Sequence, residues 1–415
     1  MSKPQRHIYL DHAATTPTAP EVVKEMLPFL QTAFGNPGSF HSFGKDAKDA
    51  IDQARGTVAA FIKARPDEII FTGSGTESDN LAVLGYARAH AAQGRHIVTT
   101  SIEHHAVLEP MQFLAKKEGF ELTVVPVGRN GIVDAQNVVD AIRKDTTIIS
   151  VMLVNNEIGT IQPVADIGRA IEKMKKRGEA PHAAFHTDAC QAAAYLPLDV
   201  LKLHVDLLTL NGSKIYGPKG TGVLYAKRGV KLQPLQFGGT QEKSLRPGTE
   251  NVAGIVGLAK AIELVEESRD KEAARLEPLQ IKLAQGILSS IPKTRLNGDW
   301  EHRIPNNVNI SFLDLEGEAL LLYLDAKGIY ASTGSACTSA SLDPSHVILA
   351  LGLPYEVAHG SLRFSLGRAT TVVDIDMVLE VLPPLVQKLR SMSPVRVDKK
   401  YFEDDFPCQI TARKV

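Results

Sequence analysis

Short apolar runs alternate with amphipathic helical patterns over the first half of the 415-residue chain. The apolar runs, which we predict to be strands, lie at 69–72, 96–100, 121–127, 146–154, 183–187 and 206–210. Most of the segments between them have helical periodicity, as at 45–63 and 77–92. Alternation of this kind predicts an α/β fold in which helices cover a mainly parallel sheet.

The pattern changes past residue 255, where a long charged helical pattern runs from 259 to about 283. Strand-like runs follow at 307–312 and 361–366. A single core stops growing below this chain length, so a second, smaller α+β domain is expected after the mainly parallel one.

We therefore divide the chain into a large domain, a small domain and a tail. The predicted bounds are 18–258 for the large domain, 1–17 and 259–394 for the small domain, and 395–415 for the C-terminal tail. Aromatic residues amid charge in the tail suit a segment that docks a partner, and disorder is the alternative.

The charge balance is almost neutral, with 46 Lys and Arg against 47 Asp and Glu. This balance offers no basic footprint for nucleic acid or for an anionic membrane, and it favours small-molecule chemistry. No stretch approaches the roughly 20 apolar residues that a membrane-spanning helix needs. The N-terminus runs straight into a strand-like segment without a signal peptide, so we expect a cytoplasmic protein. Three scattered cysteines form neither a disulfide framework nor a zinc spacing.

A glycine-rich turn, Thr72-Gly73-Ser74-Gly75-Thr76-Glu77, joins the first predicted strand to a helix. The free N–H groups at such a helix start, around Gly75 and Thr76, could bind a phosphate. Most turns of this composition only make a tight corner, and this one matches neither a Walker loop nor the GxGxxG pattern. The turn by itself is therefore a weak signal.

Polar residues follow three further strands of the predicted sheet. They are Glu103-His104-His105, Asn155-Asn156-Glu157, and Asp188 with Gln191. Because ligands collect at the carboxyl ends of parallel strands, these groups should converge at one edge. Solvated or helix-capping histidines are the alternative for His104 and His105. A metal site is disfavoured because no second ligand cluster completes the set.

Lys214 lies in the apolar and glycine-rich stretch 207–222. A lysine in such surroundings can have a lowered pKa and serve as a Schiff-base amine. The alternative is a lysine whose side chain extends from a loop into solvent. The residues around Lys214 leave both readings open.

Cys337 lies in a run of small residues, Ser332-Thr333-Gly334-Ser335-Ala336-Cys337-Thr338-Ser339-Ala340-Ser341. An exposed thiol on a mobile loop is what a sulfur relay requires, because it must meet both a substrate and an acceptor. The common alternative is a buried cysteine that acts as a small apolar residue. The flanking serines and threonines argue against burial.

Together these motifs resemble the cysteine desulfurases of the NifS/IscS kind, within the class-V aminotransferases, over roughly residues 8 to 394. The matching segments are Thr76-Glu77-Ser78-Asp79-Asn80, Asn155-Asn156-Glu157-Ile158-Gly159, Asp188 with Gln191, Lys214 to Gly220, and Ser335 to Ser339. The resemblance implies the fold of fold-type-I enzymes that use pyridoxal phosphate (PLP), and a homodimer with active sites at the subunit interface.

The resemblance also implies roles for the residues of the active site. Lys214 looks like the Schiff-base lysine, and Asp188 like the carboxylate that keeps the pyridine nitrogen protonated. His104 matches a residue that stacks on the ring and transfers protons. Asn156 and Gln191 match residues that contact the O3′ side of the ring.

The remaining implied contacts hold the phosphate and the substrate. Thr76, in the turn with Gly75, corresponds to a phosphate ligand, and Thr249 corresponds to a ligand that reaches across from the partner subunit. Arg363 with Asn36 resembles the clamp for the substrate carboxylate, which a guanidinium binds in a bidentate manner.

The chain departs from the family pattern just before Lys214. The family has a serine, a small residue and a histidine there, whereas this chain has Asn211-Gly212-Ser213. The replaced residues are phosphate ligands in the family. Asn211 and Ser213 can still donate hydrogen bonds, so we expect the phosphate site to persist with a weaker or rearranged grip.

The activity implied by the resemblance is conversion of L-cysteine to L-alanine, with the sulfur transferred to Cys337 as a persulfide. Its acceptor would be an iron–sulfur scaffold or a tRNA-thiolation protein, which the sequence does not identify. A selenocysteine lyase or an aminotransferase on the same fold is the first alternative. A scaffold that has lost its chemistry is the second, and a colourless purified protein would support it.

Overall fold

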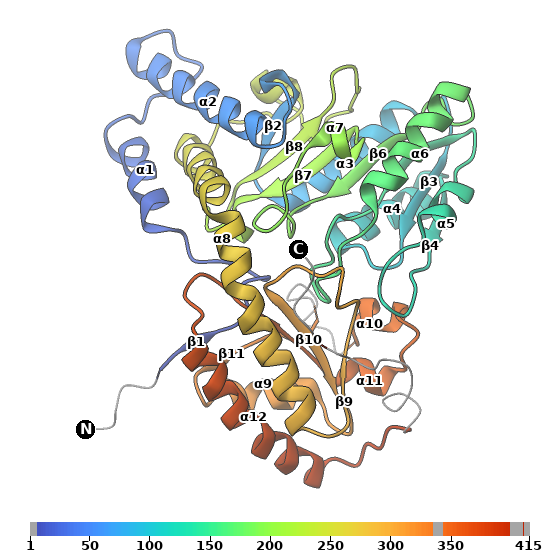
Figure 1. Ribbon diagram of the computed structural model, residues 1–415. Coiled ribbons are helices and arrows are strands. Elements are labelled where there is room, and N and C mark those ends of the chain that lie inside the picture. Colours follow the sequence, from blue (N-terminus) through green and yellow to red (C-terminus); the bar gives the residue numbers. More distant parts are fainter. Residues whose placement is uncertain (1–5, 335–342, 399–409, 411–415) are drawn as a thin grey trace.

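The computed structural model describes residues 6–334, 343–398 and 410 (Figure 1). Cys337 and most of the predicted tail lie outside these residues. Within them, one group of elements surrounds a seven-stranded sheet, here called the larger part, and another surrounds a three-stranded sheet, called the smaller part.

The seven-stranded sheet has the strand order β2-β8-β7-β6-β5-β3-β4. Its strands are β2 (Ile69–Thr72), β3 (His96–Thr100), β4 (Glu121–Val125), β5 (Thr146–Ser150), β6 (Ala184–Asp188), β7 (Leu207–Asn211) and β8 (Gly222–Ala226). Strand β8 is antiparallel to both of its neighbours, and the other adjacent pairs are parallel. The predicted α/β fold with a mainly parallel sheet is confirmed.

Helices cover both faces of this sheet. They are α1 (Pro20–Gln31), α2 (Ser42–Phe61), α3 (Gly75–Ala89), α4 (His105–Lys117), α5 (Ala135–Asp140), α6 (Val164–Arg177) and α7 (Val200–Leu203). Successive strand residues point to opposite faces. Ile70 accordingly packs in the core with α3 and α4, while Ile69 and Phe71 pack in the core with α2 and α6. Both faces are buried, which explains the continuous apolar runs in the sequence.

The smaller part is built on an antiparallel sheet of order β12-β10-β9 and a parallel pair of short strands, β1 and β11. The strands are β1 (Ile8–Tyr9), β9 (Thr294–Leu296), β10 (Asn307–Phe312), β11 (Ile329–Tyr330) and β12 (Ser361–Ser365). The helices are α8 (Val252–Ser290), α9 (Gly317–Asp325), α10 (His346–Ala350), α11 (Tyr355–His359) and α12 (Val372–Met392).

Helix α8 runs through both parts of the molecule (Figure 1). It contacts α1 and α2 in the larger part, and α12, β9 and β10 in the smaller part. The boundary predicted between residues 258 and 259 falls inside this helix, so the proposed domain limits stay a prediction. Within the described ranges no helix has both the length and the apolar character needed to cross a membrane.

Two features of the fold position the candidate site. The strands β2, β3, β6 and β7 end at the same edge of the large sheet, because they run in the same direction. The segment that follows β1 then crosses to this edge. Its Thr16 donates from the backbone N–H to the carbonyl of Ser213 (2.9 Å), which lies just after β7.

Candidate active site

A cavity of about 240 Å³ lies at the carboxyl ends of these strands. It brings together ten of the predicted site residues, which are Gly75, Thr76, His104, Asn156, Asp188, Gln191, Asn211, Ser213, Lys214 and Arg363. These residues come from separate segments of the chain, and only the fold unites them.

Three predicted site residues do not line this cavity. Asn36 is exposed, and its Oδ1 accepts a hydrogen bond from the N–H of Gly38 (2.9 Å). Thr249 is exposed as well. Cys337 lies outside the described residues. The roles of all three stay predictions.

Lys214 ends a single 3-10 turn, Gly212–Lys214, that directly follows β7. Its Nζ donates a hydrogen bond to the backbone carbonyl of Ala14, in the segment that crosses from β1. The chain then bends at Tyr216, which adopts a left-handed conformation with φ of 62°. Lys214 therefore lines the cavity, and the Ala14 carbonyl helps to hold its amine there.

Asp188 is the last residue of β6 and is only 7% exposed. Its Oδ1 accepts a hydrogen bond from the backbone N–H of Cys190 (2.9 Å). Gln191, one turn further, donates from Nε2 to the carbonyl of Ala13 (2.9 Å). The carboxylate thus has a fixed orientation at the end of the strand, as a partner for a cationic ring nitrogen requires.

His104 is the N-cap of α4, and its Nδ1 accepts a hydrogen bond from the N–H of Ala106 (3.1 Å). The alternative of a capping histidine and the expected place in the site are therefore both realised. Burial lowers the pKa of His104, with Asp188 opposing and Lys214 reinforcing the shift. Because Nδ1 accepts, the neutral ring holds its proton on Nε2.

The N-terminus of α3 forms another wall of the cavity through Ser74, Gly75 and Thr76. Ser74 caps the helix by accepting from the N–H of Glu77 (3.1 Å). A Cβ at Gly75 would lie 2.9 Å from Cys190 Sγ and 3.1 Å from Asn211 Nδ2, so the close approach of these segments requires glycine. Backbone N–H groups at such a position favour an anion.

Arg363 of β12 is almost fully buried at 1% exposure. Its Nη2 donates to Asp11 Oδ1 (2.8 Å) and its Nη1 to the carbonyl of Asn156 (2.9 Å), while its buried Nε has no hydrogen-bond partner. The guanidinium is thus held rigidly at the cavity wall. An unused donor remains on it.

Several further residues line the same cavity without having been predicted from the sequence, namely Ala13, Ala14, Asp79, Met152 and Cys190. The two alanines contribute backbone carbonyls, which no residue pattern reveals. Asp79 could have been found, because it follows Thr76 by three positions and so lies on the same face of α3. Burial and nearby Asp188 raise the pKa of the Cys190 thiol well above its usual value.

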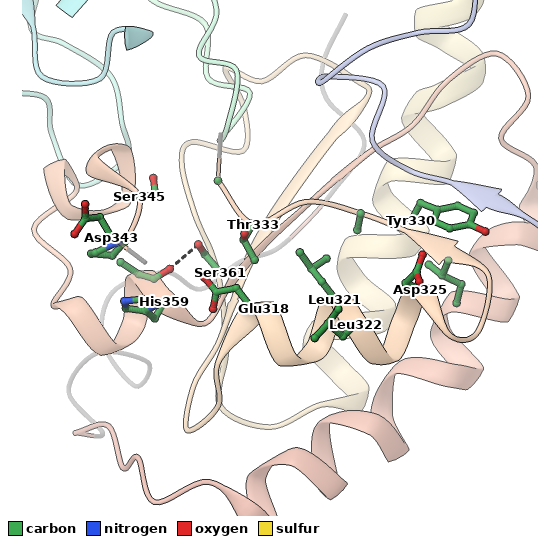
Figure 2. A pocket seen from close by; sticks show the side chains of 15 residues that line it. Glu318, Leu321, Leu322, Asp325, Tyr330, Thr333, Asp343, Ser345, His359 and Ser361 are labelled. Carbon is green, nitrogen blue, oxygen red and sulfur yellow. Dashed lines mark hydrogen bonds between the residues drawn. The ribbon is translucent and has the colours of Figure 1, made fainter. Parts of the chain in front are cut away.

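A second cavity, of about 360 Å³, lies in the smaller part (Figure 2). Glu318, Leu321, Leu322 and Asp325 reach it from α9, and exposed Asp343 lies at its border. Gly334 and Asp343, which flank the segment containing Cys337, both line it. This cavity holds none of the predicted cofactor residues.

The chain matches the family model described as Aminotransferase class-V over residues 8–378. It is 51% identical to Cysteine desulfurase IscS of Clostridium botulinum, covering 95% of this chain and 98% of that protein. Identity to Cysteine desulfurase IscS of Methanosarcina thermophila is also 51%, covering 95% and 96%. The chain belongs to the cysteine desulfurases of the class-V aminotransferase family.

Solved structures agree with this membership. A structure titled NifS-like protein superposes with a TM-score of 0.86 at 35% identity, covering 92% of this chain and all of that one. A structure titled SspA in complex with cysteine superposes with a TM-score of 0.76 at 35% identity, covering 86% of this chain and 98% of that one. The cysteine desulfurase fold is therefore shared along nearly the whole chain.

Cysteine desulfurases as a family depend on PLP, and the cavity of this family member fits that group. It offers a lysine amine, a fixed carboxylate and a helix N-terminus on different walls. The buried Oδ1 of Asn211, which has no hydrogen-bond partner, adds a polar atom that only an occupant would pair. Across the described part of the chain, no three His, Cys, Asp or Glu side chains gather as a metal ion would require.

Proposed function

We propose that this chain removes sulfur from L-cysteine and releases L-alanine, with PLP on Lys214 and the sulfur received by Cys337. The observation that carries the proposal is the single cavity shared by Lys214, Asp188 and His104. Family membership supports the proposal, because the chain matches relatives named cysteine desulfurase over nearly their full lengths.

The cofactor would be held by groups on opposite walls. Asp188 would pair with the ring nitrogen, Gln191 and Asn156 would contact the O3′ side, and the turn at Gly75 and Thr76 would bind the phosphate. The chemistry that PLP supplies when bound is an electron-accepting ring, which acidifies the α-proton of an attached amino acid. Each of these positions requires only groups that already line the cavity.

The residues of the chain would then bind and orient cysteine and move its protons. Arg363 would hold the substrate carboxylate, with Asp11 and the Asn156 carbonyl fixing the guanidinium. Lys214 would take the α-proton at its amine. Neutral His104, which holds a proton on Nε2, would serve in proton transfer, the role that the resemblance implies for it.

Sulfur would leave the substrate by attack of the Cys337 thiolate on the cysteine sulfur. A sulfur–sulfur bond forms, the carbon–sulfur bond breaks with its electrons going to the substrate carbon, and protonation of that carbon gives alanine. The only free cysteine among the described residues, Cys190, is a poor candidate for this role. Burial raises its pKa, so it would rarely form the thiolate that acts as nucleophile.

We further propose a homodimer in which Thr249 completes the phosphate site of the partner subunit. Thr249 is exposed and does not line the cavity of its own chain, as this role requires. The sulfur acceptor would be an iron–sulfur scaffold or a tRNA-thiolation protein. The cytoplasmic location inferred from the sequence stays a prediction.

The test is to incubate the purified protein with L-cysteine and to measure alanine and protein persulfide together. Equal amounts of both, with persulfide mapped to Cys337 by mass spectrometry, are the expected result. A keto acid in place of alanine would indicate an aminotransferase. Activity only with selenocysteine would indicate a lyase for that substrate. Absence of bound PLP from the purified protein would contradict the proposal outright.

A further inference from the structure

Asp79 is a buried carboxyl group that the proposed mechanism does not use. It lies on α3, one turn after Thr76, is 1% exposed, and lines the same cavity as Asp188. Its Oδ1 has no hydrogen-bond partner. A buried carboxylate oxygen without a partner is costly, so the ionisation state of Asp79 needs an explanation.

The neighbours of Asp79 do not neutralise a negative charge. Two other buried acids, Asp188 and Glu103, raise its pKa further beyond the main effect of burial, and a hydrogen bond from Thr209 only partly opposes them. The basic side chain of His186 lies close by, with its Nε2 3.5 Å from Asp79 Oδ1, beyond good hydrogen-bond distance.

His186 cannot serve as a cationic partner. It is fully buried, and burial lowers its pKa to about 4. Both ring nitrogens already have hydroxyl partners, with Nδ1 2.8 Å from Ser150 Oγ and Nε2 3.1 Å from Thr209 Oγ1. The ring is therefore neutral at neutral pH, and His186 adds no positive charge beside Asp79.

Two neighbouring buried acids can share a proton, and local hydrogen bonds decide which of them keeps it. Asp188 accepts a bond from the N–H of Cys190, which favours its charged form. Asp79 has an oxygen without any such donor. The asymmetry places the proton on Asp79 and the charge on Asp188.

We propose that Asp79 is a protonated carboxylic acid in the folded chain and that it acts as a positioning residue, confining the negative charge of the pair to Asp188. The inference rests on the proposed function for its purpose, since Asp188 is the group that would face the PLP ring nitrogen. A second charge beneath the cavity would compete with Asp188 for the ring proton. With Asp79 neutral, Asp188 is the one carboxylate of the pair that can accept a hydrogen bond from the protonated ring nitrogen.

Infrared spectroscopy of the full-length chain tests the protonation directly and does not depend on activity. Glu103 has a pKa raised to about 8 and is also protonated at pH 7, so the aspartates are labelled with ¹³C at the carboxyl group to separate the two. We expect one protonated aspartic acid band at pH 7 in the wild-type chain, absent in Asp79→Asn and retained in Asp188→Asn. A wild-type spectrum with ionised aspartate bands alone would overturn the proposal, whether or not either variant folds.

The positioning role is tested by the absorption spectrum of added PLP as a function of pH. Asp79→Asn keeps the shape and the neutrality of the side chain, so its titration midpoint should match wild type within about 0.3 pH units, whereas Asp188→Asn should shift it by more than one unit. Equal shifts in both variants would show that Asp79 carries charge. The other titratable groups around it are Glu103, His186, Cys190, His104 and Lys214, which both variants retain.

The two proposals fail separately. If the wild-type protein forms no alanine from cysteine while the infrared band is present, the proposed function is wrong and the protonation of Asp79 stands. If alanine forms and the band is missing, Asp79 is ionised and the proposed function is unaffected.

Discussion

The two cavities differ in how deeply their acidic side chains are buried, and their volumes do not reflect this difference. The larger one, about 360 Å³, is bordered by the exposed carboxylates of Glu318, Asp325 and Asp343. The smaller one, about 240 Å³, contains Asp188 and Asp79, which are almost fully buried. In the smaller cavity burial raises the pKa of Asp79 and lowers that of His104, and perturbed groups of this kind cluster at reaction sites. Buried titratable side chains that converge from separate strands identify the reaction site better than volume does.

The sharpest test of this contrast is Lys214→Ala, in the smaller cavity. Loss of the amine should reduce alanine formation on the order of a thousandfold or more, because both cofactor attachment and proton transfer depend on it. The assay measures alanine released from L-cysteine, together with the yellow colour of the protein. Lys219→Ala is the matched control and should keep both, since Lys219 donates to the Thr16 carbonyl (2.5 Å) and does not line this cavity. An equal loss of alanine formation in both variants would mean that the substitutions impair folding rather than the reaction.

Cys337→Ser asks whether Cys337 takes part in the reaction at the smaller cavity. A hydroxyl is a far weaker nucleophile than a thiolate, so alanine formation should fall by at least about a hundredfold. Cysteine should still bind and change the absorption of the cofactor, since only the sulfur step is blocked. Cys408→Ala is the control and should retain alanine formation. Full activity in Cys337→Ser would move the sulfur step to another residue.

The burial of the smaller site also predicts a pH-dependent stability. His186 has a pKa of about 4 in the folded chain, below its ordinary value, so the unfolded state takes up the proton first as pH falls. Stability is therefore lost between about pH 6.5 and 4, by about 3 kcal/mol from this group. Denaturant unfolding at several pH values should give a shallower dependence in His186→Gln than in wild type. An unchanged dependence would show that other groups cause the loss.

Asn211 and Ser213 allow a smaller change within the same cavity. Replacing them by serine and histidine restores the family pattern and should tighten PLP binding about tenfold, because one charge-assisted hydrogen bond to the phosphate is gained. Titration of the cofactor-free protein with PLP measures the dissociation constant. The single substitution Ser213→His separates the two positions. Unchanged affinity in the double variant would show that the turn at Thr76 alone holds the phosphate.

Substitutions in the larger cavity should leave alanine formation almost unchanged. Glu318→Gln combined with Asp325→Asn removes two exposed charges, which solvent screens from the reaction site. Alanine formation with a small-molecule reductant should change by less than about twofold. A loss beyond tenfold would show that the two cavities are coupled, and the contrast drawn between them would fail.

The strands were predictable because burial on both faces makes them continuous apolar runs, as at Leu207–Asn211, which was predicted at 206–210. Strand β8 was missed because it begins with Gly222, which looks like part of the preceding glycine-rich turn. Helix α8 spans Val252–Ser290 and is longer than the predicted 259–283. The charged and small residues that flank the predicted range also favour a helix.

Much of the site was predictable because side chains with distinctive chemistry follow the strands. The carbonyls of Ala13 and Ala14 were not, because any residue supplies such a carbonyl and only the crossing of the segment after β1 brings them there. Asp79 was quoted as part of a motif without a role. Its importance depends on burial and on the absence of a partner for Oδ1, which no residue pattern encodes.

Helix α8 has a consequence for how the molecule comes apart. Its 39 residues extend about 58 Å. Because the helix contacts α1 and α2 in the larger part and α12, β9 and β10 in the smaller part, we expect unfolding of either part to disrupt the helix as well. Backbone amides near its two ends should consequently exchange with solvent through the same opening event. We expect one cooperative unfolding transition rather than two, with the shared helix transmitting the loss of either core to the other.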